Sequence, residues 1–276
     1  MKQFAKKRVF ITGAASGLGR ALAVKFAEMG WRVAIADIHL ERLAETRGLI
    51  EELGATTLEI ECDVTSYEAL SKAANMLEKN WGGVDIIFNN AGVAGLGQFE
   101  DITQEEWHRV INVDLWSVIY GCQAFVPMMK RQGGGYIVNT ASAAGIVSLP
   151  QMSNYNVAKA GVISLSESLK TELASDNIGV TVVAPTVFKA NLLDTMANAE
   201  KHEMGRSFRK QLETTKVTAE SIADLAIDAI RKNRLYVVPQ ADAKRAWLFK
   251  RLFPELYVRT ITLLYRKRLW LFNGID

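Results

Sequence analysis

Two residues that can hold and move a proton, Tyr155 and Lys159, lie four positions apart in the stretch NYNVAK. Residues at positions i and i+4 share one face of a helix, so both side chains can contact the same small molecule. A lysine cation beside a phenol favours the phenolate and lowers the pKa of the tyrosine. The pair is therefore a candidate general acid/base. An ordinary surface pair has the same spacing, so the rest of the chain has to decide between the two interpretations.

A second candidate site is the glycine-rich stretch TGAASGLGR, which follows the short apolar run RVFIT. Gly13, Gly17 and Gly19 permit positive φ angles and a close approach of the backbone to a phosphate, and the helix that follows would offer free N–H groups. A loose glycine pattern also fits a simple tight turn. Asp37 ends the next apolar run, where a carboxylate can accept a hydrogen bond from a ribose 2′-hydroxyl. Together the two features favour a dinucleotide site.

The same carboxylate indicates which dinucleotide is bound. Asp37 would repel the 2′-phosphate of NADP, and no basic residue occupies Ser16 or Ile38, so we expect NAD as the cofactor, with NADP less favoured. Arg20 and His39 are the nearest cations that argue against this preference. We expect Arg20 to point along the surface of its helix.

The elements that must position these residues follow from an alternation of apolar runs and amphipathic segments. Strand-like runs occupy 8–12, 32–37, 56–63, 84–91, 135–142, 179–185 and 235–239, and helical patterns occupy 17–29, 40–53, 67–79, 104–131, 155–175 and 219–231. Continuous apolar strands between helices predict an α/β fold, a Rossmann-like, doubly wound parallel sheet in three α/β/α layers. We expect one dinucleotide-binding and catalytic domain over 1–240 and a basic, aromatic helical tail over 241–276.

The glycine spacing TGxxxGxG resembles that of the short-chain dehydrogenase/reductase family, and four further signals match that family in order. They are NNAG at 89–92, Asn112 in INVDLW, Ser142 at the end of GYIVNTAS, and YNVAK at 155–159. The ordered set is far more specific than any single motif. The resemblance implies an NAD(H)-dependent oxidoreductase that interconverts a secondary alcohol and a ketone, or a primary alcohol and an aldehyde.

The resemblance also implies a role for each matching residue. Tyr155 is similar to the general acid/base of the family, and Lys159 to the residue that lowers the tyrosine pKa and binds the nicotinamide ribose. Ser142 is similar to the hydroxyl that polarises the substrate oxygen, and Asn112 to the residue that holds a water beside the lysine. Asp114 is interpreted as a helix residue rather than a second acid. The implied cofactor-binding positions are Gly13, Ser16, Gly17, Leu18, Gly19, Asp37, Asp63, Val64, Asn90, Ala91, Gly92, Tyr155, Lys159, Pro185 and Val187, and no metal is implied.

One segment departs from the family pattern. After the sixth strand the family has Pro-Gly and then a threonine, whereas this chain has APTVFKANL. Pro185 is kept, Thr186 stands in place of the glycine, and Ala190 stands in place of the threonine. Because this segment contacts the nicotinamide carboxamide in the family, the departure affects how the nicotinamide is anchored and leaves the predicted reaction class unchanged.

The composition limits the possible partners. A net charge of +3 is too small to indicate nucleic acid, and Cys62 and Cys122 show neither metal-ligand nor disulfide spacing. No apolar run has the length of a signal-peptide core or a membrane span. We therefore expect a cytoplasmic enzyme, and a homodimer or homotetramer. A non-catalytic NAD-binding regulatory or scaffold protein with the same fold is the alternative.

The sequence gives less specific signals for the residues that would contact the substrate. The segment 188–216 is expected to form a lid over a neutral, fairly apolar alcohol or ketone. Further pocket candidates are mostly apolar: Val93, Ala94, Leu96, Ala144, Leu149, Gln151 and Met152. The tail over 241–276 carries eight Lys/Arg against three Asp/Glu, interleaved with aromatic residues, and Pro254 is expected to separate two helices. It can pack on its own subunit or a neighbour, or lie on an anionic membrane surface, and nucleic-acid binding is the least favoured of its possible roles.

Overall fold

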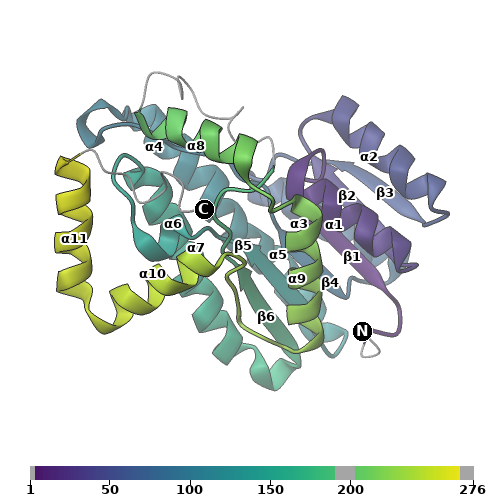
Figure 1. Cartoon of the computed structure of the whole chain (residues 1–276). Helices are drawn as coiled ribbons and strands as arrows, with labels where there is room; N and C mark the ends of the chain where they lie inside the picture. Colours follow the sequence, from purple (N-terminus) through teal and green to yellow (C-terminus); the bar gives the residue numbers. More distant parts are fainter. Residues whose placement is uncertain (1–3, 190–202, 268–276) are drawn as a thin grey trace.

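A computed structural model describes residues 4–189 and 203–267, and in it seven parallel strands form a single sheet (Figure 1). The strands are β1 (Arg8–Thr12), β2 (Arg32–Asp37), β3 (Thr57–Glu61), β4 (Ile86–Asn89), β5 (Gly135–Thr140), β6 (Ile178–Val183) and β7 (Tyr236–Val237). The longer helices are α1 (Gly17–Glu28), α2 (Leu40–Glu52), α3 (Tyr67–Trp81), α4 (Gln104–Ile111), α5 (Ser117–Arg131), α7 (Ser153–Glu172), α8 (Glu203–Thr214), α9 (Ala219–Arg231), α10 (Ala241–Leu252) and α11 (Pro254–Arg266). The predicted α/β fold is confirmed.

The sheet has the strand order β3-β2-β1-β4-β5-β6-β7, so the order reverses between β1 and β4. In a doubly wound sheet this reversal leaves a crevice at the carboxyl ends of the two central strands, where ligands bind. The stretches that carry the candidate residues leave the sheet at this edge. Five strands end two residues earlier than the apolar runs suggested, which releases the residues that follow them into loops. They are β3, β4, β5, β6 and β7, which end at Glu61, Asn89, Thr140, Val183 and Val237.

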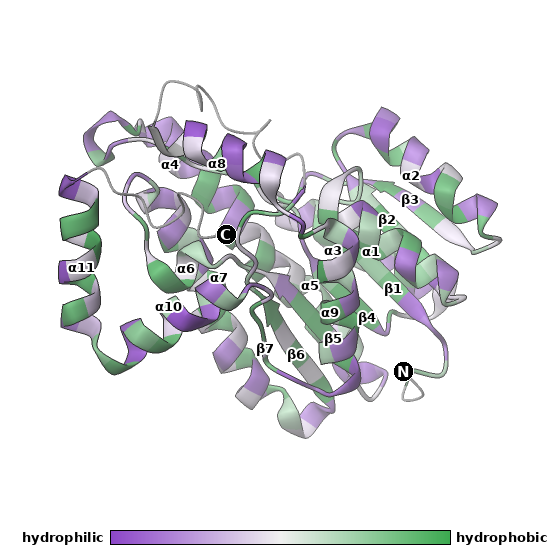
Figure 2. Cartoon of the chain, in the orientation of Figure 1, coloured by the Kyte–Doolittle hydropathy of each residue, from purple (hydrophilic) through white to green (hydrophobic). Residues whose placement is uncertain are grey.

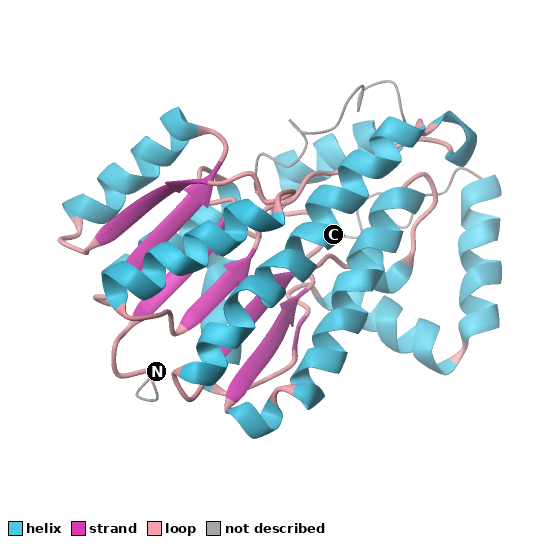
Figure 3. Cartoon of the chain, turned by 180° about the vertical axis from the view of Figure 1, so that it is seen from behind, coloured by secondary structure: helices cyan, strands magenta, loops and turns pink. Residues whose placement is uncertain are grey.

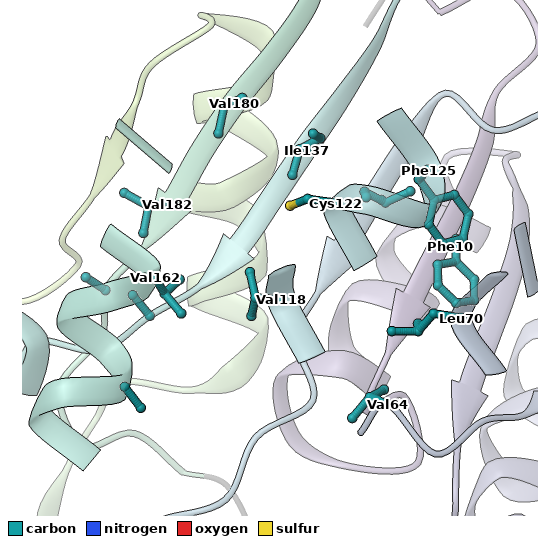
Figure 4. Close-up of a cluster of buried hydrophobic side chains, with 14 of the residues drawn as sticks. Phe10, Val64, Leu70, Val118, Cys122, Phe125, Ile137, Val162, Val180 and Val182 are labelled. Atoms are coloured by element: carbon teal, nitrogen blue, oxygen red, sulfur yellow. The ribbon is translucent and has the colours of Figure 1, made fainter. Parts of the chain in front are cut away.

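The two faces of the sheet are covered by different helices, and neighbouring residues of one strand face opposite layers. Helices lie against both faces of the sheet (Figure 3). Val9 and Ile11 pack with α1 and α9, whereas Phe10 packs with α3 and α5. The Phe10 ring stacks on Phe125 at 4.9 Å between ring centroids (Figure 4). Hydrophobic residues dominate the strands, and the helices carry mixed surfaces (Figure 2). Burial on both faces explains why the strands are continuous apolar runs.

The helical segment predicted over 104–131 consists of three parts. A π-helical turn, η2 (Asn112–Trp116), lies between α4 and α5. A π-turn accommodates one extra residue and changes which side chains of the helix face the protein interior. The sequence periodicity predicted a helix here, and the structure adds a local change of register within it.

The tail folds as two helices separated at Pro254, as expected, and part of it packs on the same chain. The Tyr257 hydroxyl of α11 donates to the Val147 carbonyl at 2.7 Å, and the Lys250 ammonium of α10 donates to the Ile146 carbonyl at 2.6 Å. Both acceptors belong to α6 (Ala144–Val147), the short helix that follows Ser142. Contact of the tail with a second copy or a membrane surface stays a prediction. Over the described residues, no helix combines the length and hydropathy that crossing a membrane requires.

Replacing Tyr257 by Phe tests this attachment. Tyr257 is 5% exposed, so the change leaves the Val147 carbonyl without its partner, and we expect a loss of about 1–2 kcal/mol in the free energy of unfolding. Chemical denaturation measures the loss. The matched control is Leu256→Ala at an exposed position of the same helix, for which we expect a change within about 0.5 kcal/mol. Equal stability of the Tyr257→Phe variant and the parent would show that the tail is not held in this way.

Candidate active site

The glycine turn between β1 and α1 is shaped to receive a phosphate. Gly13 and Gly17 have φ angles of 66° and 51°, and a Cβ added to Gly19 would lie 2.1 Å from the Gly13 carbonyl oxygen. The N-cap Ser16 makes no side-chain cap, and the first turn of α1 contains no acid. The first N–H groups of a helix have no partner within it, so this uncapped N-terminus can bind the pyrophosphate of a dinucleotide.

Asp37 lies beside this turn at the end of β2. Its carboxylate accepts hydrogen bonds from the Ala15 N–H and the His39 N–H, both at 3.0 Å. The Arg20 guanidinium donates to the Ala15 carbonyl in the glycine turn at 2.6 Å, and on α2 it donates to Glu45 at 2.8 Å and to Thr46 at 3.0 Å. The residue that would favour a 2′-phosphate is therefore already engaged with neighbouring side chains.

The NNAG loop after β4 is fixed to the glycine turn by Thr12. The Thr12 hydroxyl accepts from the N–H groups of Asn90 and Ala91 at 2.9 and 3.1 Å, and the Asn90 amide donates to the Thr12 carbonyl at 3.0 Å. Thr140, at the end of β5, donates to Asn90 at 3.2 Å. These bonds join the ends of three central strands. The loop can therefore form one wall of the dinucleotide crevice.

The other predicted cofactor positions lie after β3 and β6. Val64 is buried, whereas Asp63 is exposed and accepts from the Thr65 N–H at 2.9 Å. Pro185 is buried, and its carbonyl accepts from the Ala143 N–H at 2.9 Å and from the Ser142 hydroxyl at 3.4 Å. The adjacent segment is held by Gln240, which accepts from the Thr186 N–H and donates to the Val187 carbonyl. Ala190 lies outside the described residues.

Ser142, Tyr155 and Lys159 converge beyond the carboxyl end of β5. The Ser142 hydroxyl, just after the strand, accepts from the Ala144 N–H at 3.1 Å. Tyr155 and Lys159 follow on α7, as their spacing predicted, and the lysine Nζ lies 5.6 Å from the centroid of the tyrosine ring. The same Nζ donates to the Thr140 carbonyl at 3.2 Å. A phenol, an ammonium group and a hydroxyl are thus gathered at one place.

The electrostatics of Tyr155 differ from the simple expectation of a lysine that lowers its pKa. Burial raises the pKa of the Tyr155 phenol above its ordinary value, the negative charge of Asp114 raises it further, and a hydrogen bond with Ser142 lowers it. The expectation considered only the pair on one helix face. The structure adds the burial and a carboxylate that the pair did not include.

Asn112 differs from this cluster in its exposure, and the water-holding role predicted for it stays a prediction. It is exposed at the start of η2, whereas Asp114, two residues later, is completely buried against Lys159. Asp114 Oδ1 lies 3.1 Å from Lys159 Nζ and accepts from the Val93 N–H at 3.0 Å. Asp114 is a helix residue, as the sequence suggested, and the structure adds its contact with Lys159. The π-turn brings the aspartate inward and leaves Asn112 at the surface.

One sequence signal could have identified Asp114. It is the only charged residue between Arg109 and Lys130, a stretch of twenty otherwise uncharged residues. A single carboxylate in such an apolar segment is either exposed or paired when buried, because an unpaired buried charge is costly. Its partner, Lys159, is 45 positions away along the chain. Only the folded structure shows that the two meet.

The expected lid and pocket residues are partly described. Within the segment 188–216, residues 190–202 lie outside the described part, and most of the other residues form α8. Phe208 of α8 is buried in the same apolar cluster as Met152, Leu149 and Tyr155. The surroundings of Tyr155 over the described residues are thus mainly apolar.

A doubly wound parallel sheet with a glycine turn at its reversal point and a buried Tyr-Lys pair beside it defines an oxidoreductase that binds a nicotinamide dinucleotide. Residues 7–201 match the family model described as short chain dehydrogenase. The chain belongs to the short-chain dehydrogenase/reductase family.

Individual relatives agree with this assignment over nearly the whole chain. The protein named "Putative oxidoreductase SadH" of Mycobacterium tuberculosis is 32% identical over 268 residues, which is 95% of this chain and 96% of the relative. A short-chain dehydrogenase/reductase from Burkholderia phymatum, solved in complex with NAD, matches at a TM-score of 0.85 with 29% identity, over 91% of this chain and 95% of that one. Levodione reductase matches at a TM-score of 0.77 with 27% identity, over 88% and 98%.

The close packing at Gly19 leads to a test of the dinucleotide site. A methyl group at this position would collide with the Gly13 backbone, which cannot move away as a flexible side chain can. We expect Gly19→Ala to lower the affinity for NADH by about tenfold or more, measured by fluorescence titration. Gly48→Ala is the matched control, because no atom lies within 4 Å of the added Cβ in the middle of α2. Unchanged affinity in the Gly19→Ala variant would remove the turn from the cofactor site.

Proposed function

We propose that this enzyme transfers a hydride between NAD(H) and the carbinol or carbonyl carbon of a neutral, fairly apolar alcohol or ketone. The observation that carries the proposal is the convergence of Ser142, Tyr155 and Lys159 at the carboxyl end of the sheet, beside the glycine turn. The hydride chemistry is supplied by the nicotinamide, and the protein orients the reactants and handles the proton.

The proton step is assigned to Tyr155. In carbonyl reduction the phenol gives its proton to the substrate oxygen as negative charge develops there, and in alcohol oxidation the phenolate takes that proton back. Ser142 donates a hydrogen bond to the same oxygen and stabilises the developing charge. Lys159 provides a fixed positive charge 5.6 Å from the centre of the phenol ring. The three roles need no residue beyond those that the structure brings together.

NAD is the proposed cofactor, and two contacts support it. Asp37 presents its carboxylate to the glycine turn, and Arg20 is engaged with Glu45 and Thr46. The structural relative from Burkholderia phymatum was solved with NAD, which agrees with this proposal. A 2′-phosphate placed near the Asp37 carboxylate would be repelled.

The apolar surroundings support the proposed class of substrate. Leu96, Leu149 and Met152 are all at most 8% exposed and belong to the cluster that contains Tyr155. A buried apolar surface favours a neutral carbon skeleton over a carboxylate or phosphate ester. A screen of secondary alcohols, ketones, primary alcohols and aldehydes, in both directions and with both cofactors, tests the proposal and identifies the substrate. If the protein binds NAD but turns over no compound, the non-catalytic alternative is favoured.

Tyr155→Phe removes only the hydroxyl that would carry the proton. We expect kcat to fall by about 100-fold or more, with NADH affinity nearly unchanged, because the ring and Lys159 remain. The matched control is Tyr136→Phe, another buried tyrosine with a lysine, Lys170, over its ring, but far along the sheet from the site. We expect near-normal kcat in this control. Substantial activity in the Tyr155→Phe variant would exclude the assigned role.

Asp37 is tested by comparing the two cofactors. We expect NADP to bind about tenfold or more weakly than NAD, and Asp37→Ala to narrow this ratio by removing the repulsion of the 2′-phosphate. Isothermal titration calorimetry with each cofactor measures both affinities on the same protein. Tighter binding of NADP than NAD to the parent protein would contradict the proposed preference.

A further inference from the structure

Asp114 is a buried carboxylate that the proposed reaction does not use directly. Its Oδ1 is 3.1 Å from Lys159 Nζ and 3.0 Å from the Val93 amide nitrogen, and it is 0% exposed. Its second oxygen, Oδ2, is also buried and has no hydrogen-bond partner among the described residues. The contacts thus direct this carboxylate toward the lysine ammonium and satisfy only one of its oxygens.

The position of Asp114 is tightly constrained. A Cβ added to Gly92 would lie 2.7 Å from Asp114 Oδ1 and 3.4 Å from Lys159 Nζ, so the NNAG loop closes over the ion pair. Lys159 itself is 3% exposed. Water therefore screens the pair poorly, and the charge state of one partner strongly affects the other.

Among the charged groups of the described residues that act on Asp114, Lys159 is the one that forms an ion pair with it. From α4, the charge of Arg109 also acts on Asp114, and its guanidinium forms two hydrogen bonds of 2.7 Å with Glu106. The NNAG loop contributes a backbone amide, from Val93. From α7, Lys159 faces the aspartate, and the charge of the aspartate acts on the phenol of Tyr155. Burial raises the pKa of the Asp114 carboxyl, and the charge of Lys159 opposes this rise, so the carboxylate form depends on the lysine. Together the two groups form one nearly neutral unit next to the phenol.

We infer that Asp114 is a positioning residue that balances the charge of Lys159, and that Tyr155 therefore keeps its proton at neutral pH and serves as the proton donor in carbonyl reduction. This inference rests on the proposed function, in which Tyr155 is the general acid/base. It adds which protonation state Tyr155 has at neutral pH. A lysine alone beside the phenol would favour the phenolate, whereas a lysine paired with a carboxylate favours it much less.

The reaction balances with the phenol as the donor. The carbonyl carbon of the substrate gains a hydride from the reduced nicotinamide, and the electron pair of the carbonyl π bond moves to oxygen. That oxygen takes the Tyr155 proton, which gives the alcohol, the oxidised nicotinamide and a phenolate. A proton from solvent restores the phenol before the next turnover.

Asp114→Asn tests the charge without a large change of shape, because the amide oxygen can still accept from the Val93 N–H. The direct measurement is the ultraviolet absorbance of tyrosinate against pH, recorded with and without Tyr155→Phe so that the difference isolates Tyr155 among the seven tyrosines. We expect the Tyr155 phenolate to form at a pH about one unit lower in the Asp114→Asn protein. Glu105→Gln, the same acid-to-amide change at an exposed position of α4, is the matched control and should leave the titration unchanged.

The pH dependence of kcat gives a second measurement with a substrate from the screen. As pH rises and the phenol loses its proton, kcat for carbonyl reduction falls and kcat for alcohol oxidation rises. In the Asp114→Asn variant, we expect the fall and the rise to move to lower pH by the same amount. A Tyr155 titration that stays in place or moves upward would overturn the inference, whatever the activity. A downward shift in a protein that turns over no carbonyl compound would support the charge balance and refute the proposed enzymatic function.

Discussion

The burial of the Lys159 ammonium group is the constraint around which the site is arranged. A charged amine that is 3% exposed has lost nearly all of its water and needs partners within the protein. Two separate parts of the chain supply them: the Thr140 carbonyl at the end of β5 and the Asp114 carboxylate in the π-turn. Because each partner lies on a different element, the cation fixes the end of the sheet, the turn η2 and helix α7 relative to one another.

Small residues make this convergence possible. Gly92 lets the NNAG loop lie directly over the ion pair, and Gly145 brings α6 so close to α7 that an added Cβ would lie 2.5 Å from the Lys159 backbone. Gly19 does the same for the phosphate-binding turn against Gly13. The site therefore depends as much on the absence of side chains at a few positions as on the groups that perform the chemistry.

The tail adds a further layer behind the site. Tyr257 and Lys250 bond the carbonyls of Val147 and Ile146, the last residues of the short helix that follows Ser142. A cavity of about 180 Å³ lies between this region and α11, lined by Ser148, Tyr257 and Ile261 among others. The basic tail lies outside the sheet. Through α6 it is nevertheless connected to the loop that carries the Ser142 hydroxyl, a proposed catalytic group.

The sequence by itself determined the fold class, the order of the strands and helices and the glycine turn, and it predicted Asp37 and the set of Ser142, Tyr155 and Lys159 as site residues. These features are local: a buried parallel strand must be a continuous apolar run, and a spacing of four residues places two side chains on one helix face. The role of residues 112–116 was decided only by the tertiary structure. Helical periodicity cannot reveal a π-turn, so the sequence favoured Asn112, whereas the fold turns Asp114 toward Lys159 because a buried cation and a buried carboxylate stabilise each other.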